Sequence, residues 1–488
     1  MRAHSLDEFQ GTPSMTRMTG ATALLNGLID HGIDTVFGLP GGQLDHFFDS
    51  MYHAGGKVRF IGSRHEQGAA YMAFGYARST GKPAAYAVVP GPGVLNTTAA
   101  LCTAYACNAP VLCVTGQIPS ASIGKGFGEL HELPDQLATL RTLTKWAARI
   151  DSPAQAPQLV AEAFAQLCGG RMRPVALEMA MDVMGDEGEV TAAPPLAPKI
   201  PVADPDKIAA AARKIANARF PLIYVGGGAA DAADEVRRLA EVLQAPVVSF
   251  RGGRGVVADD HPLGLTLPAG HRLWSKVDVV IGIGSRMIEP LRHWGTDDAL
   301  EVVRIDIDAE ELTRLGRAAT NLLGDARATL NDLIPAIERQ LGGARHAHED
   351  IALAKAAVAR EIQLVQPQFG FLSAIRDVLP RDGIFCDEIT QCGFASWYAF
   401  PTLGPRQHIN CGYQGTLGYG YATALGVKVA HPRRPVVSIA GDGGFMFNVQ
   451  ELATAVQYGI GLKTIVFNSN SFGNVQRQQR EWFGNRLI

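Results

Sequence analysis

Short apolar runs recur along most of the chain, and each is followed by a turn and then by residues with helical periodicity. Near the N-terminus, apolar residues share one face of a predicted helix that begins after Thr19 and ends at Gly32. Further strands are predicted at 34–38, 58–62, 84–89 and 111–115. Strands that alternate with helices are typical of a doubly wound parallel sheet, so residues 16–187 are predicted to form an α/β domain.

The same alternation predicts two further domains. A proline- and alanine-rich stretch, TAAPPLAPKIPVAD, is a predicted linker between about 190 and 206. The second predicted domain, 203–342, has strands at 222–225, 246–250, 277–283 and 302–307. A charged helix over about 349–364 leads to the third, 366–488, with strands at 383–387, 436–440 and 464–467. The predicted fold is α/β with three doubly wound parallel-sheet domains.

Composition narrows the class of protein. A hydrophobic content of 47%, with 19% charged residues and a net charge of −3, fits a large α/β enzyme. It gives no electrostatic reason to expect nucleic acid or membrane partners. Seven cysteines without paired metal-ligand spacing favour a reduced, cytoplasmic protein. The first 14 residues lack the apolar run of a signal peptide, and we expect them to form a loose tail.

The stretch 436–475 holds the strongest candidate chemistry. Its first strand stops at Gly441-Asp442-Gly443-Gly444, and its second, 464–467, ends at Asn468-Ser469-Asn470-Ser471. A strand, a crossover helix and a second strand form a right-handed βαβ unit, which brings both strand ends to one edge of the sheet. Asp442 and residues 468–471 are therefore expected to face one point.

Such an edge suits a diphosphate held by a metal ion. Glycines let the backbone approach a diphosphate closely, and a hard cation with oxygen ligands can bridge a carboxylate and phosphate. A plain turn before a helix is the alternative. Asn448 is predicted to cap that helix, with Glu451 three residues on as in a capping box.

This combination resembles the thiamine diphosphate motif, in which Gly-Asp-Gly is followed at a fixed interval by two asparagines. By that resemblance Asp442 is one magnesium ligand, the second asparagine falls on Ser469, and the carbonyl of Ser471 is the third ligand. A hydroxyl is a poorer magnesium ligand than an amide oxygen, so Asn468, Asn470 or a water are alternatives to Ser469. The cofactor would also contact Gly441, Gly443 and Gly444.

A distant segment, RHEQGAAYMAFGYARSTGKP, resembles the pyrimidine-binding domain of acetolactate synthase-like thiamine diphosphate enzymes. The resemblance implies that Glu66 contacts the aminopyrimidine ring of the cofactor. A carboxyl group in a dry setting can share a proton with that ring and so activate the cofactor towards a 2-oxo acid. The alternative role of an acid in a first helical turn is to complement the helix dipole.

Other residues enter the candidate site through the same resemblance. Further cofactor contacts are implied at Pro40, Gly41, Gly91, Glu388, Thr390, Gly415 and Leu417. In relatives a bulky apolar residue at the position of Leu417 wedges under the cofactor, although an ordinary core position is the alternative. The substrate pocket is expected to involve Gln117, His131 and Leu417, and His131 is either an acid/base or a surface histidine.

The central domain leaves the question of a flavin open. Gly226-Gly227-Gly228 follows a strand, but a glycine-rich turn is a weak signal for a nucleotide. Arg286 matches the first arginine of the flavin-contacting segment of acetolactate synthases. The next residues, 287–290, do not match its acidic pair, which counts against bound FAD.

The resemblance implies an enzyme that decarboxylates a 2-oxo acid such as pyruvate and ligates the product to a second carbonyl compound. Alternatives are a 2-oxo acid decarboxylase, an aldehyde lyase or a cyclic diketone hydrolase with the same cofactor, and a cofactor-binding protein without activity. In the family the active site lies between subunits, which implies a homodimer at least and often a homotetramer. Relatives continue beyond the magnesium segment, so the third domain is expected to be incomplete at its C-terminus.

Overall fold

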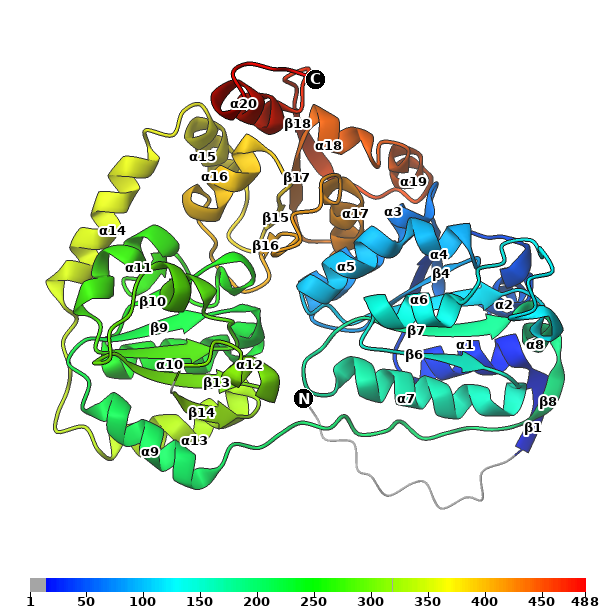
Figure 1. Ribbon diagram of the computed structural model, residues 1–488, viewed down its shortest axis with the longest axis horizontal. Helices are drawn as coiled ribbons and strands as arrows, with labels where there is room; N and C mark the ends of the chain where they lie inside the picture. The colour runs from blue at the N-terminus through cyan, green and yellow to red at the C-terminus, as the bar shows by residue number, and fades with distance from the viewer. Residues whose placement is uncertain (1–14, 318) are drawn as a thin grey trace. The chain divides into compact units, whose positions relative to one another are not determined.

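The computed structural model describes residues 15–317 and 319–488 (Figure 1). The predicted tail, 1–14, lies outside the described residues. The chain divides into two compact units. The first holds the described residues up to Pro198, except Phe74–Lys82 and Ala106–Asn108, which belong to the second unit together with Lys199–Ile488.

The first unit is built on a six-stranded parallel sheet in the order β3-β2-β4-β5-β7-β6. Its strands are β2 (Thr35–Gly38), β3 (Arg59–Gly62), β4 (Ala84–Val88), β5 (Val111–Gln117), β6 (Trp146–Ile150) and β7 (Val175–Ala180). The helices are α1 (Gly20–Asp30), α2 (Asp45–His53), α3 (Glu66–Thr80), α4 (Pro92–Asn96), α5 (Thr98–Ala106), α6 (Gln136–Leu143), α7 (Ala156–Cys168) and α8 (Met181–Gly185). The part of α3 from Phe74 and the last residue of α5, Ala106, are counted in the second unit. A separate antiparallel pair joins β1 (Met15–Thr19) to β8 (Glu187–Thr191).

The predicted helix boundaries at the start of this unit are confirmed. The Thr19 hydroxyl caps α1 by accepting a hydrogen bond from the Thr22 amide at 3.2 Å. Gly32, with φ +82°, follows the helix in a left-handed conformation that glycine adopts without strain. The strands β6 and β7 and the β1–β8 pair were not predicted from the sequence.

The second unit contains two parallel sheets. The central sheet has the order β11-β10-β9-β12-β13-β14, and the C-terminal sheet has the order β16-β15-β17-β18. Central strands are β9 (Pro221–Val225), β10 (Val247–Ser249), β11 (Gly264–Thr266), β12 (Val279–Ile283), β13 (Glu301–Asp306) and β14 (Thr320–Leu323). C-terminal strands are β15 (Ile384–Cys386), β16 (His408–Ile409), β17 (Val436–Gly441) and β18 (Lys463–Phe467).

Helices cover both sheets of the second unit (Figure 1). With the central sheet they are α9 (Pro205–Ala216), α10 (Ala233–Leu243), α11 (Leu267–Leu273), α12 (Ala309–Thr313) and α13 (Ala326–Glu338). After α14 (Glu349–Ile362) come α15 (Gln368–Val378), α16 (Gln391–Ala399), α17 (Gly420–Ala430), α18 (Asp442–Met446), α19 (Glu451–Gln457) and α20 (Gly473–Trp482). The prediction of three doubly wound parallel sheets is confirmed, and the exact domain boundaries stay predictions.

The predicted capping box at Asn448 is wrong. Gln450 occupies the N-cap position of α19 and makes no side-chain capping hydrogen bond. Asn448 is instead fully buried, and its Nδ2 donates a hydrogen bond to the carbonyl of Gly418 at 2.6 Å. Asn448 thus bonds to a residue distant in sequence, Gly418, and does not cap the helix that follows it.

Two further predictions concern composition. All seven cysteines are free thiols. Among the helices of the described residues, none combines the length and apolarity needed to cross a bilayer.

Candidate active site

The turn after β17 is a closely packed cradle. β17 ends at Gly441 and α18 begins at Asp442. A Cβ atom at Gly443 would lie 2.6 Å from the Phe472 ring, and one at Gly444 would lie 3.3 Å from Cδ1 of Leu417. A side chain at Gly443 would clash with Phe472, so this turn requires glycine in order to pack against its neighbours.

Residues from two other segments border the same cradle. A Cβ atom at Gly441 would lie 3.2 Å from Cγ2 of Thr390, and one at Gly444 would lie 3.2 Å from Cγ of Glu388. Leu417 is partly buried and packs against Gly444. The structure therefore brings together Glu388, Thr390, Leu417 and the glycine turn. Gly415 lies two residues before Leu417 in an exposed, left-handed conformation with φ +61°.

The pairing of β17 with β18 places the candidate metal ligands at one sheet edge. The two strands are parallel, with Gly441 opposite Phe467, so Asp442 and Asn468 follow at the same level. The Ser469 hydroxyl donates a hydrogen bond to the Ser471 carbonyl at 3.1 Å. The Oδ1 atom of Asn468 accepts a hydrogen bond from the amide of Asn470 at 3.0 Å.

These oxygen atoms fit a magnesium ion. Two neighbouring ligands of an octahedral Mg²⁺, each about 2.1 Å from the metal, lie about 3.0 Å apart. The Ser469 Oγ to Ser471 O separation of 3.1 Å is that of the hydrogen bond between them, and it brings both atoms close enough together to bind one ion. Asn468 already uses its amide oxygen within the turn. Among the described residues no three His, Cys, Asp or Glu side chains cluster as a metal site, so hydroxyl and carbonyl donors would have to complete the set around Asp442.

In the first unit, Glu66 begins α3 four residues after the last residue of β3. Its side chain is 14% exposed, and its Oε2 accepts a hydrogen bond from Asn96 Nδ2 at 3.0 Å. His65 Nδ1 lies 4.0 Å from the same oxygen. One carboxylate oxygen of Glu66 is thus fixed by a neutral amide, while the side chain keeps a path to the surface. Asn96 was not predicted from the sequence.

Two glycine turns of the first unit lie near this edge of its sheet. Pro40 and Gly41 follow β2, and a Cβ atom at Gly41 would lie 2.5 Å from Cγ1 of Val89. Gly91 has φ +61°, and a Cβ atom there would lie 2.4 Å from the carbonyl oxygen of His131. Both turns therefore require glycine for close approach.

His131 lies in the loop that packs on Gly91. Its backbone is left-handed, with φ +69°, which is uncommon for a residue with a side chain. Its Nδ1 lies 3.1 Å from Oε1 of Gln43, and Gln43 Nε2 donates to the Leu130 carbonyl at 3.0 Å. Strain of this kind is often found at functional sites. The sequence analysis missed Gln43.

The predicted pocket residue Gln117 faces a buried polar network. Its Nε2 lies 3.4 Å from Oε2 of Glu178, which is fully buried in β7 and pairs with Nε of Arg149 at 2.6 Å. Gln136 Nε2 donates to Glu178 at 3.0 Å, and Gln136 Oε1 accepts from the Gly91 amide at 2.9 Å. This network holds the Gly91 turn through the hydrogen bond from the Gly91 amide to Gln136. The glutamate inside the apolar run VALEMA was the available signal for it.

The central sheet uses its glycines for internal packing. A Cβ atom at Gly226 would lie 2.2 Å from the carbonyl oxygen of Gly284, so the turns after β9 and β12 touch through their backbones. The Arg286 guanidinium stacks over the Tyr413 ring at 4.0 Å. The triple glycine therefore has a packing role that is independent of any nucleotide.

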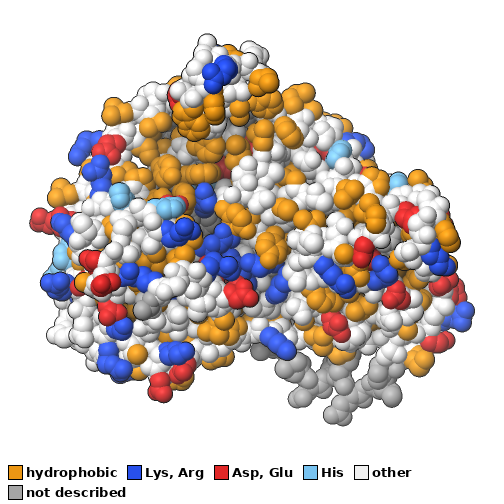
Figure 2. All heavy atoms as spheres, in the orientation of Figure 1, with side chains coloured by type: hydrophobic (Ala, Val, Ile, Leu, Met, Phe, Trp, Pro, Cys, Tyr) orange, Lys and Arg blue, Asp and Glu red, His pale blue; other side chains and the backbone are white. Residues whose placement is uncertain are grey.

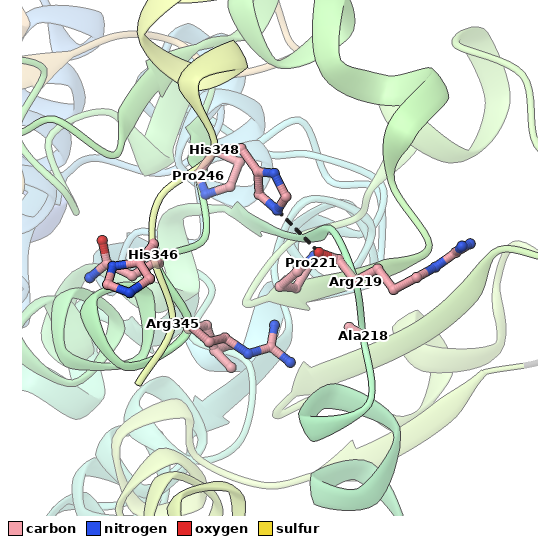
Figure 3. A pocket seen from close by; sticks show the side chains of 9 residues that line it. Ala218, Arg219, Pro221, Pro246, Arg345, His346 and His348 are labelled. Atoms are coloured by element: carbon pink, nitrogen blue, oxygen red, sulfur yellow. Dashed lines mark hydrogen bonds between the residues drawn. The ribbon is translucent and has the colours of Figure 1, made fainter. Parts of the chain in front are cut away.

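A pocket of ≈ 140 Å³ lies at the opposite edge of the central sheet (Figure 3). It is lined by Ala218, Arg219, Pro221, Leu243, Gln244, Pro246, Arg345, His346 and His348. Arg345 donates to the carbonyl of Ala216, the last residue of α9, at 2.7 Å. A basic group stabilises a helix C-terminus, which explains the position of Arg345. Ligands of α/β sheets bind at the carboxyl ends of the strands, whereas this pocket lies at the opposite edge, so we do not assign it a ligand.

Comparisons with known proteins agree with the arrangement of the three sheets. Residues 18–139 match the thiamine pyrophosphate enzyme N-terminal TPP binding domain. Residues 208–333 match the thiamine pyrophosphate enzyme central domain, and 388–488 match the C-terminal TPP binding domain.

Similar proteins cover nearly all of the chain. A probable 2-ketoarginine decarboxylase, AruI, of Pseudomonas aeruginosa is 34% identical over 469 residues, which span 94% of this chain and 83% of that protein. An acetolactate synthase of Arthrospira platensis is 33% identical, with 97% and 86% covered. The acetolactate synthase isozyme 1 large subunit of Escherichia coli is 30% identical, with 96% and 84% covered. The chain belongs to the thiamine diphosphate-dependent enzymes, as an acetolactate synthase-like carboligase or decarboxylase.

Proposed function

We propose that this enzyme, with thiamine diphosphate and Mg²⁺, decarboxylates a 2-oxo acid and ligates the product to a second carbonyl compound. The observation that carries the proposal is the Glu66 carboxylate, fixed by Asn96 at 3.0 Å beside the end of β3. Bound thiamine diphosphate supplies a nucleophile and an electron sink for decarboxylation.

The protein's own groups have distinct roles in this proposal. Glu66 holds the proton that is shared with the cofactor ring, and Asn96 orients its carboxylate. Asp442, Ser469 and the Ser471 carbonyl hold Mg²⁺, and the glycines of the 441–444 turn admit the diphosphate. Their support is the sheet edge that Asp442 shares with residues 468–471, and the proximity of the Ser469 and Ser471 oxygens.

A second candidate function is decarboxylation without ligation. One relative is named a probable 2-ketoarginine decarboxylase. His131, an imidazole in a left-handed backbone conformation beside Gly91, is a candidate proton donor. A proton delivered to the decarboxylated fragment gives an aldehyde, whereas an acceptor carbonyl gives a ligated product.

Product analysis separates these functions. Proton NMR would follow the purified enzyme with thiamine diphosphate and Mg²⁺, first with pyruvate and then with 2-ketoarginine. Acetolactate or acetoin supports ligation, and an aldehyde alone supports simple decarboxylation. Consumption of acyloins or cyclic diketones, with 2-oxo acids untouched, would identify a lyase or hydrolase and contradict the proposal. No turnover of any of them by protein that binds the cofactor would indicate a protein without activity.

We also propose that a second copy of the chain covers an apolar surface formed by α18 and α19. Met446, Phe447, Leu452 and Val456 are all exposed there, and Val456 is 83% exposed. Hydrophobic side chains also gather on the surface around the C-terminal elements in Figure 2. Exposed apolar groups of this extent mark interaction surfaces.

Val456→Arg is expected to weaken self-association by at least tenfold, because it places a charge in the apolar surface. Light scattering over a concentration series would show a shift from dimer towards monomer. Val202→Arg is the matched control, since Val202 is 88% exposed in the linker before α9. An unchanged mass for Val456→Arg would show that this surface is not the interface.

A further inference from the structure

The turn that carries Leu417 contains no regular secondary structure. Residues 412–419, called the Leu417 turn below, lie between β16 and α17 and form neither helix nor strand. Three of its glycines, at 412, 415 and 418, have positive φ angles. Its position must therefore come from contacts with other segments.

Glu388 supplies the most extensive of these contacts. The residue is 1% exposed, and it follows β15 by two positions. Its Oε2 accepts a hydrogen bond from the Gly420 amide at 2.8 Å. Its Oε1 accepts hydrogen bonds from the amides of Gly418 at 3.1 Å and of Ile389 at 2.8 Å. One carboxylate thus binds the end of the Leu417 turn and the first amide of α17.

Two neighbouring side chains fix the same turn through other atoms. Asp387 accepts a hydrogen bond from the Tyr419 hydroxyl, and it is itself held by Trp397 Nε1 at 2.7 Å. Asn448 Nδ2 donates to the Gly418 carbonyl at 2.6 Å. The turn is therefore held by an N–H group, a C=O group and a side chain within three residues.

Glu388 also touches the glycine turn after β17. A Cβ atom at Gly444 would lie 3.2 Å from Cγ and 3.3 Å from Cδ of Glu388, and 3.3 Å from Cδ1 of Leu417. The carboxylate accepts three backbone amides, so its charge is directed into the protein rather than towards a ligand. An anionic side chain would also repel a diphosphate.

We propose that Glu388 is a positioning residue, which sets the distance between Leu417 and the Gly441–Gly444 turn without binding the cofactor through its carboxylate. Burial raises the pKa of Glu388 to about 7, and Asp387 beside it acts in the same direction. The three amide hydrogen bonds lower the pKa and so oppose that shift. They offset part of the free energy that burial of the carboxylate costs. The inference rests on the proposed function only where the test below measures the turnover number.

The test is Glu388→Gln, which keeps the volume and one acceptor oxygen but turns an NH₂ group towards the Gly420 amide. Hydrogen exchange of a peptide covering 412–421 is expected to become at least tenfold faster. Turnover number is expected to fall at least tenfold, with the dissociation constant of thiamine diphosphate unchanged within threefold. Glu311→Gln is the matched control, because Glu311 is equally buried but lies in α12 beside the central sheet.

The two readouts separate this inference from the proposed function. Exchange in the peptide 412–421 is measured without substrate, so a wrong substrate leaves it interpretable. Unchanged exchange in Glu388→Gln would overturn the positioning role. A tenfold or larger change in cofactor affinity with unchanged exchange would identify a direct cofactor contact instead. If Glu388→Gln does not fold, Tyr419→Phe tests the same turn from Asp387 and must accelerate the same peptide.

Discussion

Replacing Glu66 with glutamine is expected to lower kcat by roughly 10²- to 10⁴-fold, the usual contribution of a positioned acid or base. Glutamine can still accept the hydrogen bond from Asn96, so the side chain keeps its place. It cannot give up or take a proton, and the proton shared with the cofactor ring is lost. Steady-state kinetics and calorimetric titration with thiamine diphosphate would show the loss of turnover without a comparable loss of affinity.

Glu162→Gln provides the control for this experiment. Glu162 lies on α7 in the same unit and accepts a hydrogen bond from Gln158 at 2.9 Å. It should retain the wild-type kcat, because it lies on a helix that carries none of the site residues. A wild-type rate in Glu66→Gln would show that Glu66 does not carry the proton.

Replacing Asp442 with alanine is expected to abolish Mg²⁺-dependent binding of thiamine diphosphate. The change removes the carboxylate that follows β17 at the edge shared with β18, which leaves a hydroxyl and a carbonyl as the proposed ligands. We expect the affinity to fall by about 100-fold or more, equivalent to about 3 kcal/mol. Calorimetry in Mg²⁺ and in EDTA measures the loss, and the rise in Tm that the cofactor gives to the wild type should disappear.

Ser469→Asn tests the same site in the opposite direction. It replaces a hydroxyl by an amide oxygen and should lower the Mg²⁺ concentration that half-saturates cofactor binding. If Asp442→Ala binds with unchanged affinity, the metal assignment is wrong. If only Ser469→Asn has no effect, a water or a neighbouring asparagine provides the ligand assigned to Ser469.

Local signals explain why most of the fold was predictable. β-branched runs predicted the strands on both sides of the glycine turn, and Thr19 and Gly32 marked the ends of a helix. The βαβ rule then placed Asp442 and residues 468–471 at one edge, as the β17–β18 register shows. These features depend on neighbours in sequence or on a handedness that all proteins share.

Contacts between distant segments were not predictable in the same way. Gln43 meets Leu130 across 87 positions, and Gln136 meets Gly91 across 45. The β1–β8 pair joins Met15–Thr19 to Glu187–Thr191. The sequence of either strand alone does not predict its pairing with the other. The sequence around Asn448 predicts a helix cap, but its side chain bonds to the distant carbonyl of Gly418.

Glu388 couples global stability to pH. Its pKa is raised from 4.5 to about 7 by burial, so below about pH 7 the folded protein holds a proton that the unfolded chain releases above pH 4.5. This contribution to stability is fully present below pH 4.5 and is lost as the pH rises through 7, with a total of about 3 kcal/mol. The Tm of the wild type relative to Glu388→Gln should therefore decrease from pH 5 to pH 8, and a constant difference would contradict the shift.

The ionised form is also the one that can accept all three amides of Ile389, Gly418 and Gly420 at once. Mild acid thus favours the fold as a whole, whereas mild base favours order in the Leu417 turn. In an enzyme built in this way the Leu417 turn is most rigid on the alkaline side of the pH at which the whole fold is most stable, and the proton on Glu388 separates the two optima.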